Sequence, residues 1–181
     1  MVMETTKEEN KRLCERYPFL IPWNRWSGMR ITEAQNGGYW AGDPTKIPEY
    51  DYEYTELDDM PDGWRKAFGE QMCEEIRDAL IEEGCLDEYM VDQIKEKFGA
   101  LRWYDHGTKA NSRVDDIIRK YEHISEETCI VCGAPATRVT LGWISPFCDE
   151  CCINCGNGRS VSIEEFYRKD DTDGGNDNAG Q

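Results

Sequence analysis

The clearest pattern in the chain is an apolar residue at every third or fourth position between Trp64 and Glu83. This spacing places the apolar side chains on one face of an α-helix. The face consists of Trp64, Phe68, Met72, Ile76, Ala79 and Leu80. Asp62 precedes the run as a candidate N-cap, and Gly84 follows it as a residue that can end a helix. We therefore predict a long, buried helix from about Trp64 to Glu83.

Capping-box patterns predict three further helices. In each pattern a Ser or Thr is followed three residues later by an acidic residue, and the two side chains can bind the free N–H groups of a first helical turn. The pairs are Thr6 with Glu9, Ser112 with Asp115, and Ser162 with Glu165. We expect the first of these helices to end near Arg16, before Pro18, and the last to end near Lys169.

Strands are predicted from alternation and from β-prone residues. Tyr50 to Tyr54 alternates tyrosine with acidic residues, which is the period of a strand. Residues 91–97 and 101–105 predict a hairpin that turns at 98–100, and residues 138–143 predict a further strand. Together with the helices, these segments predict an α+β fold with helices around a small antiparallel sheet.

Composition divides the chain into three parts. We predict an α+β domain over residues 1–123, a cysteine-rich module with a short helix over 124–169, and a disordered acidic tail over 170–181. No apolar run is long enough to cross a membrane. The polar N-terminus has no apolar signal-peptide core. We therefore expect a soluble, cytoplasmic protein without a membrane partner, whose thiols stay reduced.

Six of the nine cysteines lie between Cys129 and Cys155. Two C-x2-C pairs about 15 to 20 residues apart are typical of a four-thiolate zinc site. Cys129 and Cys132 form the first pair, before Gly133. The second pair is either Cys148 with Cys151 or Cys152 with Cys155, and Gly156 favours the latter because glycine allows a sharp turn. The spacing therefore predicts zinc as the cofactor of a C-terminal ribbon, with a disulfide cluster as the alternative.

The chain is strongly acidic, with 37 acidic and 21 basic residues and a net charge of −16. Residues 51–90 alone hold fourteen acidic and three basic residues. Phosphate repels such a chain, whereas a basic protein surface attracts it. Glu70, Glu74 and Asp78 follow one another at single-turn steps of about 6 Å on the predicted long helix. A row of carboxylates at this pitch can imitate a nucleic-acid strand, so we predict that it binds a partner. The alternative is a solvated helix face.

A second candidate surface is basic. Lys95, Lys97 and Arg102 lie in the predicted hairpin beside Phe98, Trp103 and Tyr104. Cations interleaved with aromatic rings are typical of surfaces that contact single-stranded nucleic acid. The alternative is an ordinary sheet with its aromatic residues inside and its lysines outside.

The sequence offers little for catalysis. It contains two histidines, His106 and His123, and no nucleophile, zinc-protease or phosphate-loop motif. Asp105 beside His106 is the only candidate acid–base pair. Because a site with four thiolate ligands has no open position for a substrate, we predict a protein that is not an enzyme.

Several stretches resemble a family of small proteins encoded by phages and prophages. The most specific is the block K-E-K-F-G-A-L-R-W-Y at residues 95–104, together with Y-P-F-L at 17–20 and P-D-G-W at 61–64. In this family a zinc-ribbon-like end follows the block, and its second cysteine pair matches Cys148 and Cys151. The resemblance therefore favours Cys129, Cys132, Cys148 and Cys151 as ligands.

The chain is also similar to type II-A anti-CRISPR proteins in length, acidity and its cysteine-rich end. This similarity implies an inhibitor that binds a host nucleic-acid enzyme, with a type II CRISPR nuclease and its guide RNA as the expected partner. Such a nuclease holds its heteroduplex in a positively charged channel, which would attract an acidic protein. The alternative is a zinc-ribbon adaptor or regulator that contacts nucleic acid or transcription machinery.

Overall fold

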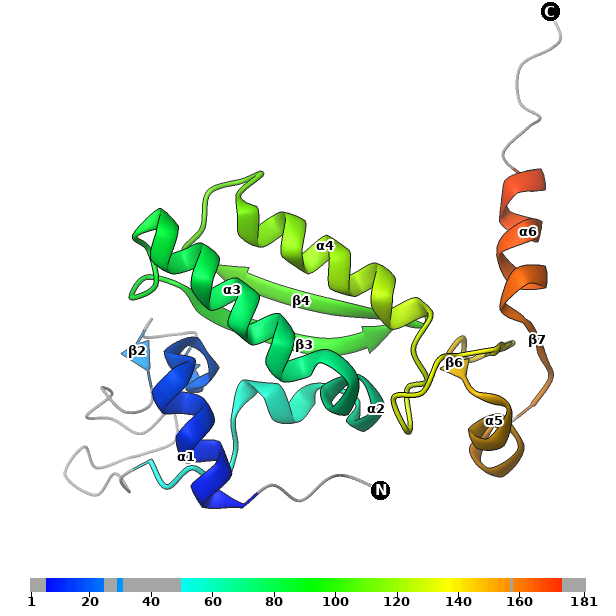
Figure 1. Ribbon diagram of the computed structural model, residues 1–181, viewed down its shortest axis with the longest axis horizontal. Helices are drawn as coiled ribbons and strands as arrows, with labels where there is room; N and C mark the ends of the chain where they lie inside the picture. The colour runs from blue at the N-terminus through cyan, green and yellow to red at the C-terminus, as the bar shows by residue number, and fades with distance from the viewer. Residues whose placement is uncertain (1–5, 25–28, 31–49, 157, 174–181) are drawn as a thin grey trace, which may run out of the picture.

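The computed structural model describes residues 6–24, 29–30, 50–156 and 158–173. Figure 1 shows two long helices side by side across one face of a two-stranded hairpin, with a small sheet and two helices at the C-terminal end. The helices are α1 (Lys7–Arg16), α2 (Asp62–Trp64), α3 (Glu70–Glu83), α4 (Arg113–Glu126), α5 (Asp149–Cys155) and α6 (Ile163–Asp173). Short 3-10 turns occupy Pro18–Leu20 and Glu56–Asp59. The α+β class predicted from the sequence is confirmed.

The strands form three antiparallel sheets. The central hairpin pairs β3 (Met90–Lys97) with β4 (Ala100–His106), as predicted, and has a bulge between Val91 and Gln93. The C-terminal sheet has the order β6-β5-β7, with β5 (Arg138–Thr140), β6 (Pro146–Phe147) and β7 (Ser160–Ser162). A third pair joins β1 (Trp23–Asn24) to β2 (Met29–Arg30). The strand predicted over residues 138–143 is therefore present but shorter.

The predicted long helix is present as one continuous helical stretch. It begins with α2, passes through a π-helical turn (Arg65–Gly69) and continues as α3 to Glu83. Its predicted apolar face is buried in the core, where it packs with residues of β3, β4 and α4. Gly84 ends the helix in the left-handed conformation with φ +71°, as expected for a C-cap glycine. The N-cap is Pro61, so the prediction of Asp62 was wrong by one residue.

Side-chain caps fix the starts of the other predicted helices. Thr6 accepts a hydrogen bond from the backbone N–H of Glu9 at 3.1 Å, and Ser112 forms a reciprocal capping box with Asp115. Ser162 accepts from the N–H of Glu165 at 3.2 Å. Helix α6 continues to Asp173, past the predicted end near Lys169, and residues 174–181 of the predicted tail lie outside the described residues. Helix α4 likewise runs through the boundary predicted between residues 123 and 124.

The strand predicted over Tyr50–Tyr54 is wrong. This segment is irregular, and Tyr52 has φ +62°, which no strand residue adopts. The tyrosine rings are used locally instead, because Tyr50 lies 4.6 Å from Tyr52 between ring centroids and its hydroxyl donates to the carbonyl of Tyr54. The alternation of tyrosine and acidic residues therefore belongs to a loop whose tyrosines contact one another, and this loop pairs with no strand among the described residues.

Candidate metal centre

The first cysteine pair lies on a tight turn that follows α4. The N–H of Cys129 donates to the carbonyl of Ala134 at 2.8 Å, and the N–H of Gly133 donates back to the carbonyl of Cys129 at 3.0 Å. Gly133 has φ +81°, a conformation that glycine adopts without strain. The turn brings Cys129 and Cys132 to one side, as the C-x2-C spacing predicts.

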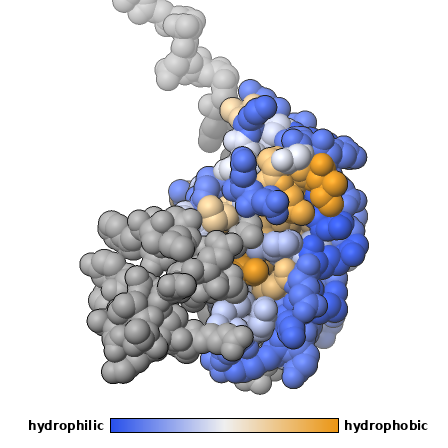
Figure 2. Space-filling model, turned by 90° about the vertical axis from the view of Figure 1, so that its left-hand side faces the viewer, coloured by the Kyte–Doolittle hydropathy of each residue, from blue (hydrophilic) through white to orange (hydrophobic). Residues whose placement is uncertain are grey.

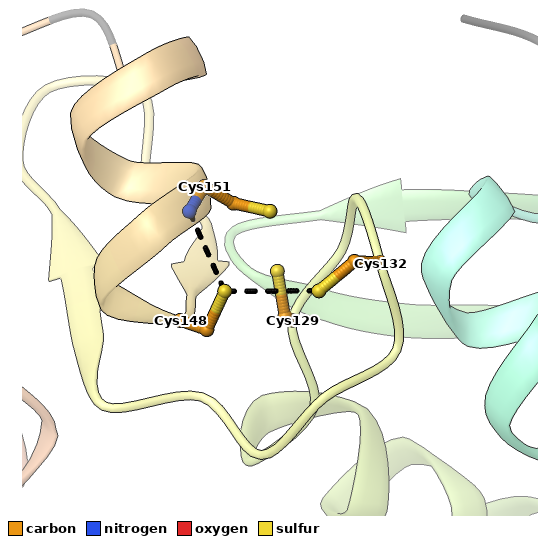
Figure 3. A group of neighbouring side chains, drawn as sticks. All are labelled: Cys129, Cys132, Cys148 and Cys151. Atoms are coloured by element: carbon orange, nitrogen blue, oxygen red, sulfur yellow. Dashed lines mark hydrogen bonds between the residues drawn. The ribbon is translucent and has the colours of Figure 1, made fainter.

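The second cysteine pair lies at the start of a helix. Cys148 is the N-cap of α5, and its Sγ accepts a hydrogen bond from the backbone N–H of Cys151 at 3.4 Å. An N-cap residue and the residue three positions later point in the same direction from a first helical turn. Strand β6 delivers Cys148 to this position, so the sheet and the helix together aim the second pair at the first (Figure 3).

The four Sγ atoms converge on one point between the two elements. All lie within 4.8 Å of one another, and Cys132 and Cys148 are 3.7 Å apart. A tetrahedral metal with metal–sulfur bonds of about 2.3 Å requires sulfur–sulfur distances of about 3.8 Å. A disulfide requires about 2.05 Å, and all nine cysteines are free. The geometry fits a single metal ion, and the predicted alternative of a disulfide cluster is wrong.

The thiol environment agrees with this arrangement. Burial opposes ionisation of Cys129, but backbone N–H donors outweigh it and lower the pKa of this thiol to about 7. The pKa of Cys151 is raised by burial and by hydrogen bonds with the neighbouring thiols. Four thiolates repel one another strongly at this distance unless a cation lies between them. A metal ion would therefore replace the shared protons of the cluster.

The structure separates the two alternatives for the second pair. Among the described residues, the candidate metal group contains Cys148 and Cys151 and not Cys152 or Cys155. Gly156 makes no left-handed turn, since its φ is −71°, and its missing side chain instead lets it lie against the carbonyl of Cys152, where an added Cβ would be 2.5 Å from the oxygen. Cys152 and Cys155 lie further along α5, half-buried and exposed respectively.

The first knuckle, residues 129–133, is joined closely to the helical domain. The N–H of Gly63 donates to the carbonyl of Ile130 at 2.9 Å, and the Trp64 indole donates to the carbonyl of Thr128 at 2.9 Å. Trp64 is fully buried. The first cysteine pair is thus fixed to the start of the long helix, so the cysteine-rich module and the helical domain share one packing interface.

In comparisons with known proteins, no protein-family model, no curated protein and no solved structure matches the chain.

The predicted acidic row is matched by a basic row on α1. Arg12 pairs with Glu70 at 2.7 Å, and Arg16 donates to Glu74 at 2.8 Å through Nε. Asp78 lies 3.2 Å from Arg77 of its own helix. Residues four apart on α1 therefore contact residues four apart on α3. The row is present on one face as predicted, but each of its carboxylates already has a cation, and its binding to a partner stays a prediction.

Helix α4 neutralises the other side of α3. Lys120 contacts Glu75 at 2.6 Å, and Arg113 pairs with Glu82. Several carboxylates of the acidic segment 51–90 therefore pair with cations of the two helices, α1 and α4, that flank α3. In the coloured part of Figure 2, which shows the side at the left of Figure 1, the surface is mostly hydrophilic, with a larger hydrophobic area at the upper right and smaller ones elsewhere.

The ion pairs between α1 and α3 predict acid sensitivity. Hydrogen bonds from Arg12 and Arg16 lower the pKa of Glu70 and Glu74 below the ordinary value of 4.5. The pairs therefore stabilise the folded protein above that value, and the contribution is lost as the pH falls through the folded-state pKa. We expect Arg12→Ala/Arg16→Ala to lower the Tm at pH 7 by no more than about 4 °C, because such pairs are partly solvated. Thermal denaturation should show the difference shrinking towards pH 3, and an equal difference at both pH values would contradict this origin.

The predicted basic residues lie together on the hairpin. Lys95 is directly opposite Arg102, and Lys97 follows two residues further on the same face. Trp103 points to the other face, where it is buried and donates to the Tyr89 hydroxyl at 2.9 Å. The alternative of a sheet with a buried aromatic interior therefore holds for Trp103 only, since Tyr104 and Phe98 remain exposed.

The candidate pair of Asp105 and His106 does not form. His106 Nδ1 lies 2.8 Å from Asp92 Oδ1, and its ring packs against Trp23. Asp105 points to the opposite face and accepts hydrogen bonds from Tyr89 and Thr108. Neighbouring strand residues face opposite sides of a sheet, so adjacency in sequence was a poor guide.

Asp105 predicts a second pH effect of opposite sign. Burial raises its pKa to about 6 from 3.8. Between these values the unfolded chain ionises while the folded protein stays protonated, so stability falls as the pH rises to about 6. We expect Asp105→Asn, which removes the ionisable carboxyl, to raise the Tm at pH 7 but not at pH 4. An equal Tm change at both pH values would contradict the raised pKa.

No helix among the described residues is long and apolar enough to cross a membrane.

Proposed function

We propose that the cysteine cluster holds a structural zinc ion. A tetrahedral set of four thiolates fits zinc or iron, and zinc needs no redox partner. All four positions are filled by protein sulfur, which leaves no place for a substrate. Elemental analysis of the purified protein should give one zinc per chain. One iron per chain, with the visible absorbance of iron–thiolate bonds, would overturn the assignment.

We further propose that the protein is a non-enzymatic inhibitor that binds a nucleic-acid enzyme in the bacterial cytoplasm. The observation that supports this proposal is the net charge of −16 on a fold that contains the four-cysteine cluster. Such a charge attracts the protein to the basic channels of enzymes that handle nucleic acids and opposes general binding to phosphate. A type II CRISPR nuclease with its guide RNA is the partner we expect, since its channel has the required sign.

The decisive test is DNA cleavage by a purified type II nuclease–guide complex in the presence of excess protein. We expect cleavage to be lost, and we expect added salt to weaken the inhibition because the encounter is electrostatic. Unchanged cleavage by several such nucleases would overturn the proposal.

The acidic row needs its own variant. Reversal of Glu70 or Glu74 to lysine would also repel Arg12 or Arg16, so we favour the isosteric change Glu70→Gln/Glu74→Gln/Asp78→Asn. A matched control removes three acids elsewhere, with the changes Glu8→Gln/Glu150→Gln/Glu164→Gln. If the row contacts the partner, the first variant loses inhibition and the control keeps it. Equal inhibition by both would remove the row from the binding surface.

A further inference from the structure

The outer face of the β3–β4 hairpin differs in charge from the rest of the molecule. We define this face by three register pairs: Gln93 with Tyr104, Lys95 with Arg102, and Lys97 with Ala100. The alternate residues Ile94, Leu101 and Trp103 are buried in the core beneath α3 and α4. One side of the hairpin therefore forms the core, and the other presents polar and basic side chains, apart from Ala100, which is buried.

The two lysines of this face, Lys95 and Lys97, form no ion pair within the described part of the chain. The Lys95 ammonium donates to the Gln93 side chain at 2.6 Å. Arg102 has Glu122 at 3.7 Å, which is a long and half-exposed contact. The face thus carries a local positive charge in a chain of net charge −16.

Exposed aromatic rings accompany these cations. The Lys95 ammonium lies 5.0 Å from the centre of the Tyr104 ring, and the Lys97 ammonium lies 5.4 Å from the centre of the Phe98 ring. Tyr104 is 42% exposed and Phe98, at the hairpin tip, is 72% exposed. Rings held in solvent beside ammonium groups offer stacking and phosphate contact at the same place.

The cysteine-rich module extends the aromatic surface. Gly99 at the hairpin tip is packed so closely that an added Cβ would lie 3.0 Å from Ile144 Cγ2. The neighbouring Trp143 is 79% exposed, and the carbonyl of Trp143 is held by the Thr140 hydroxyl at 2.7 Å. The tip and the loop that carries Trp143 are therefore adjacent and fixed by ordered structure.

We propose that this face binds single-stranded nucleic acid, with Lys95, Lys97 and Arg102 at the phosphates and Tyr104 and Phe98 stacked on bases. A protein of this net charge repels nucleic acid at long range, but the Debye length at 0.1 M salt is about 10 Å. The layer of helices that separates this face from the acidic residues of α3 has about the same thickness. Salt therefore screens much of the repulsion between those residues and a strand bound to this face. Duplex DNA offers no exposed base planes, so the stacking contacts select a single strand.

Fluorescence anisotropy with labelled oligo(dT) and the full-length protein alone, at about 0.1 M salt and above, tests this proposal. We expect Lys95→Ala/Lys97→Ala to lower the slope of log affinity against log salt by about 1.4, since each phosphate contact on a single strand contributes about 0.7. Tyr104→Ala should weaken binding roughly five-fold or more through lost stacking. The matched control Lys7→Ala/Lys11→Ala removes the same charge from α1 and should leave the slope unchanged. Metal content and Tm show that each variant is folded.

Three outcomes would overturn the proposal: no binding of oligo(dT), an equal loss in the two double-lysine variants, or equally tight binding of a polyglutamate peptide that depends on the same lysines. The last result would assign the face to an acidic protein. Because this experiment uses no nuclease, its failure is distinct from a failure of the proposed inhibitor function.

Discussion

Replacement of Cys129 by serine is expected to release the bound metal and to destabilise the protein by several kcal/mol. Serine is a poor ligand for a thiophilic ion, and three thiolates would remain around it. Structural zinc contributes about 10–16 kcal/mol of apparent binding free energy in small zinc fingers. Here the α3–α4–hairpin core can persist without metal, so we expect loss of order mainly in the segment from Thr128 onward. Hydrogen exchange should show unprotected amides in β5 to β7 and retained protection in β3 and β4.

The other cysteines provide the controls. Cys132→Ser, Cys148→Ser and Cys151→Ser should each behave like Cys129→Ser, because all four sulfurs belong to one cluster. Cys152→Ser and Cys155→Ser should keep one metal per chain and the wild-type Tm. A Cys129→Ser protein that still holds one metal ion, or a Cys152→Ser protein that loses it, would show that the ligand set is wrong.

The sequence predicted those features that depend on local chemistry. Four such features depend only on residues that are close together in the sequence, and all are confirmed. They are the N-caps at Thr6 and Ser112, the C-cap at Gly84 and the hairpin turn. The cysteine spacing likewise predicted a four-thiolate group, because a C-x2-C turn brings two sulfurs together without help from the rest of the fold.

Features that depend on distant segments were harder to predict. The partners of Glu70 and Glu74 are 58 residues away on α1. No local pattern shows that the basic row of α1 and the acidic row of α3 meet at the same pitch. The sequence does show that Arg12 and Arg16 are four residues apart, like Glu70 and Glu74. It does not show that α1 and α3 lie side by side and run in the same direction.

The close approach of the first knuckle to the long helix was also missed, although P-D-G-W contains Gly63 and Trp64, the two residues that donate hydrogen bonds to the knuckle. Gly63 and Gly133 face one another, and a Cβ on Gly133 would lie 2.6 Å from the carbonyl oxygen of Gly63. The absent side chains of these two glycines let two backbones touch, which explains how the cysteine cluster is coupled to the core.

Replacement of Gly63 by alanine is therefore expected to be among the most damaging single changes in the helical domain. The new Cβ would lie 2.2 Å from the carbonyl oxygen of Cys129 and 2.6 Å from the carbonyl carbon of Ile130. Both atoms are backbone, so the knuckle itself must move. That movement would break the bonds from the Gly63 N–H and the Trp64 indole. Overpacking together with two lost hydrogen bonds suggests a cost of about 3–5 kcal/mol and a Tm lower by about 10 °C.

Gly69→Ala is the matched control for this change because it lies in the same helical stretch. A Cβ there would meet only side chains, with Met60 Sδ at 3.3 Å and Arg65 Cγ at 3.5 Å. Alanine is favoured over glycine within a helix by about 1 kcal/mol, so this variant should equal or exceed the wild-type Tm. Gly63→Ala should in addition bind its metal more weakly in a chelator competition, since Cys129 is displaced. If the two variants unfold at the same temperature and hold metal equally well, the packing of the knuckle against the start of the long helix does not stabilise the protein. The metal centre would then be a separate module.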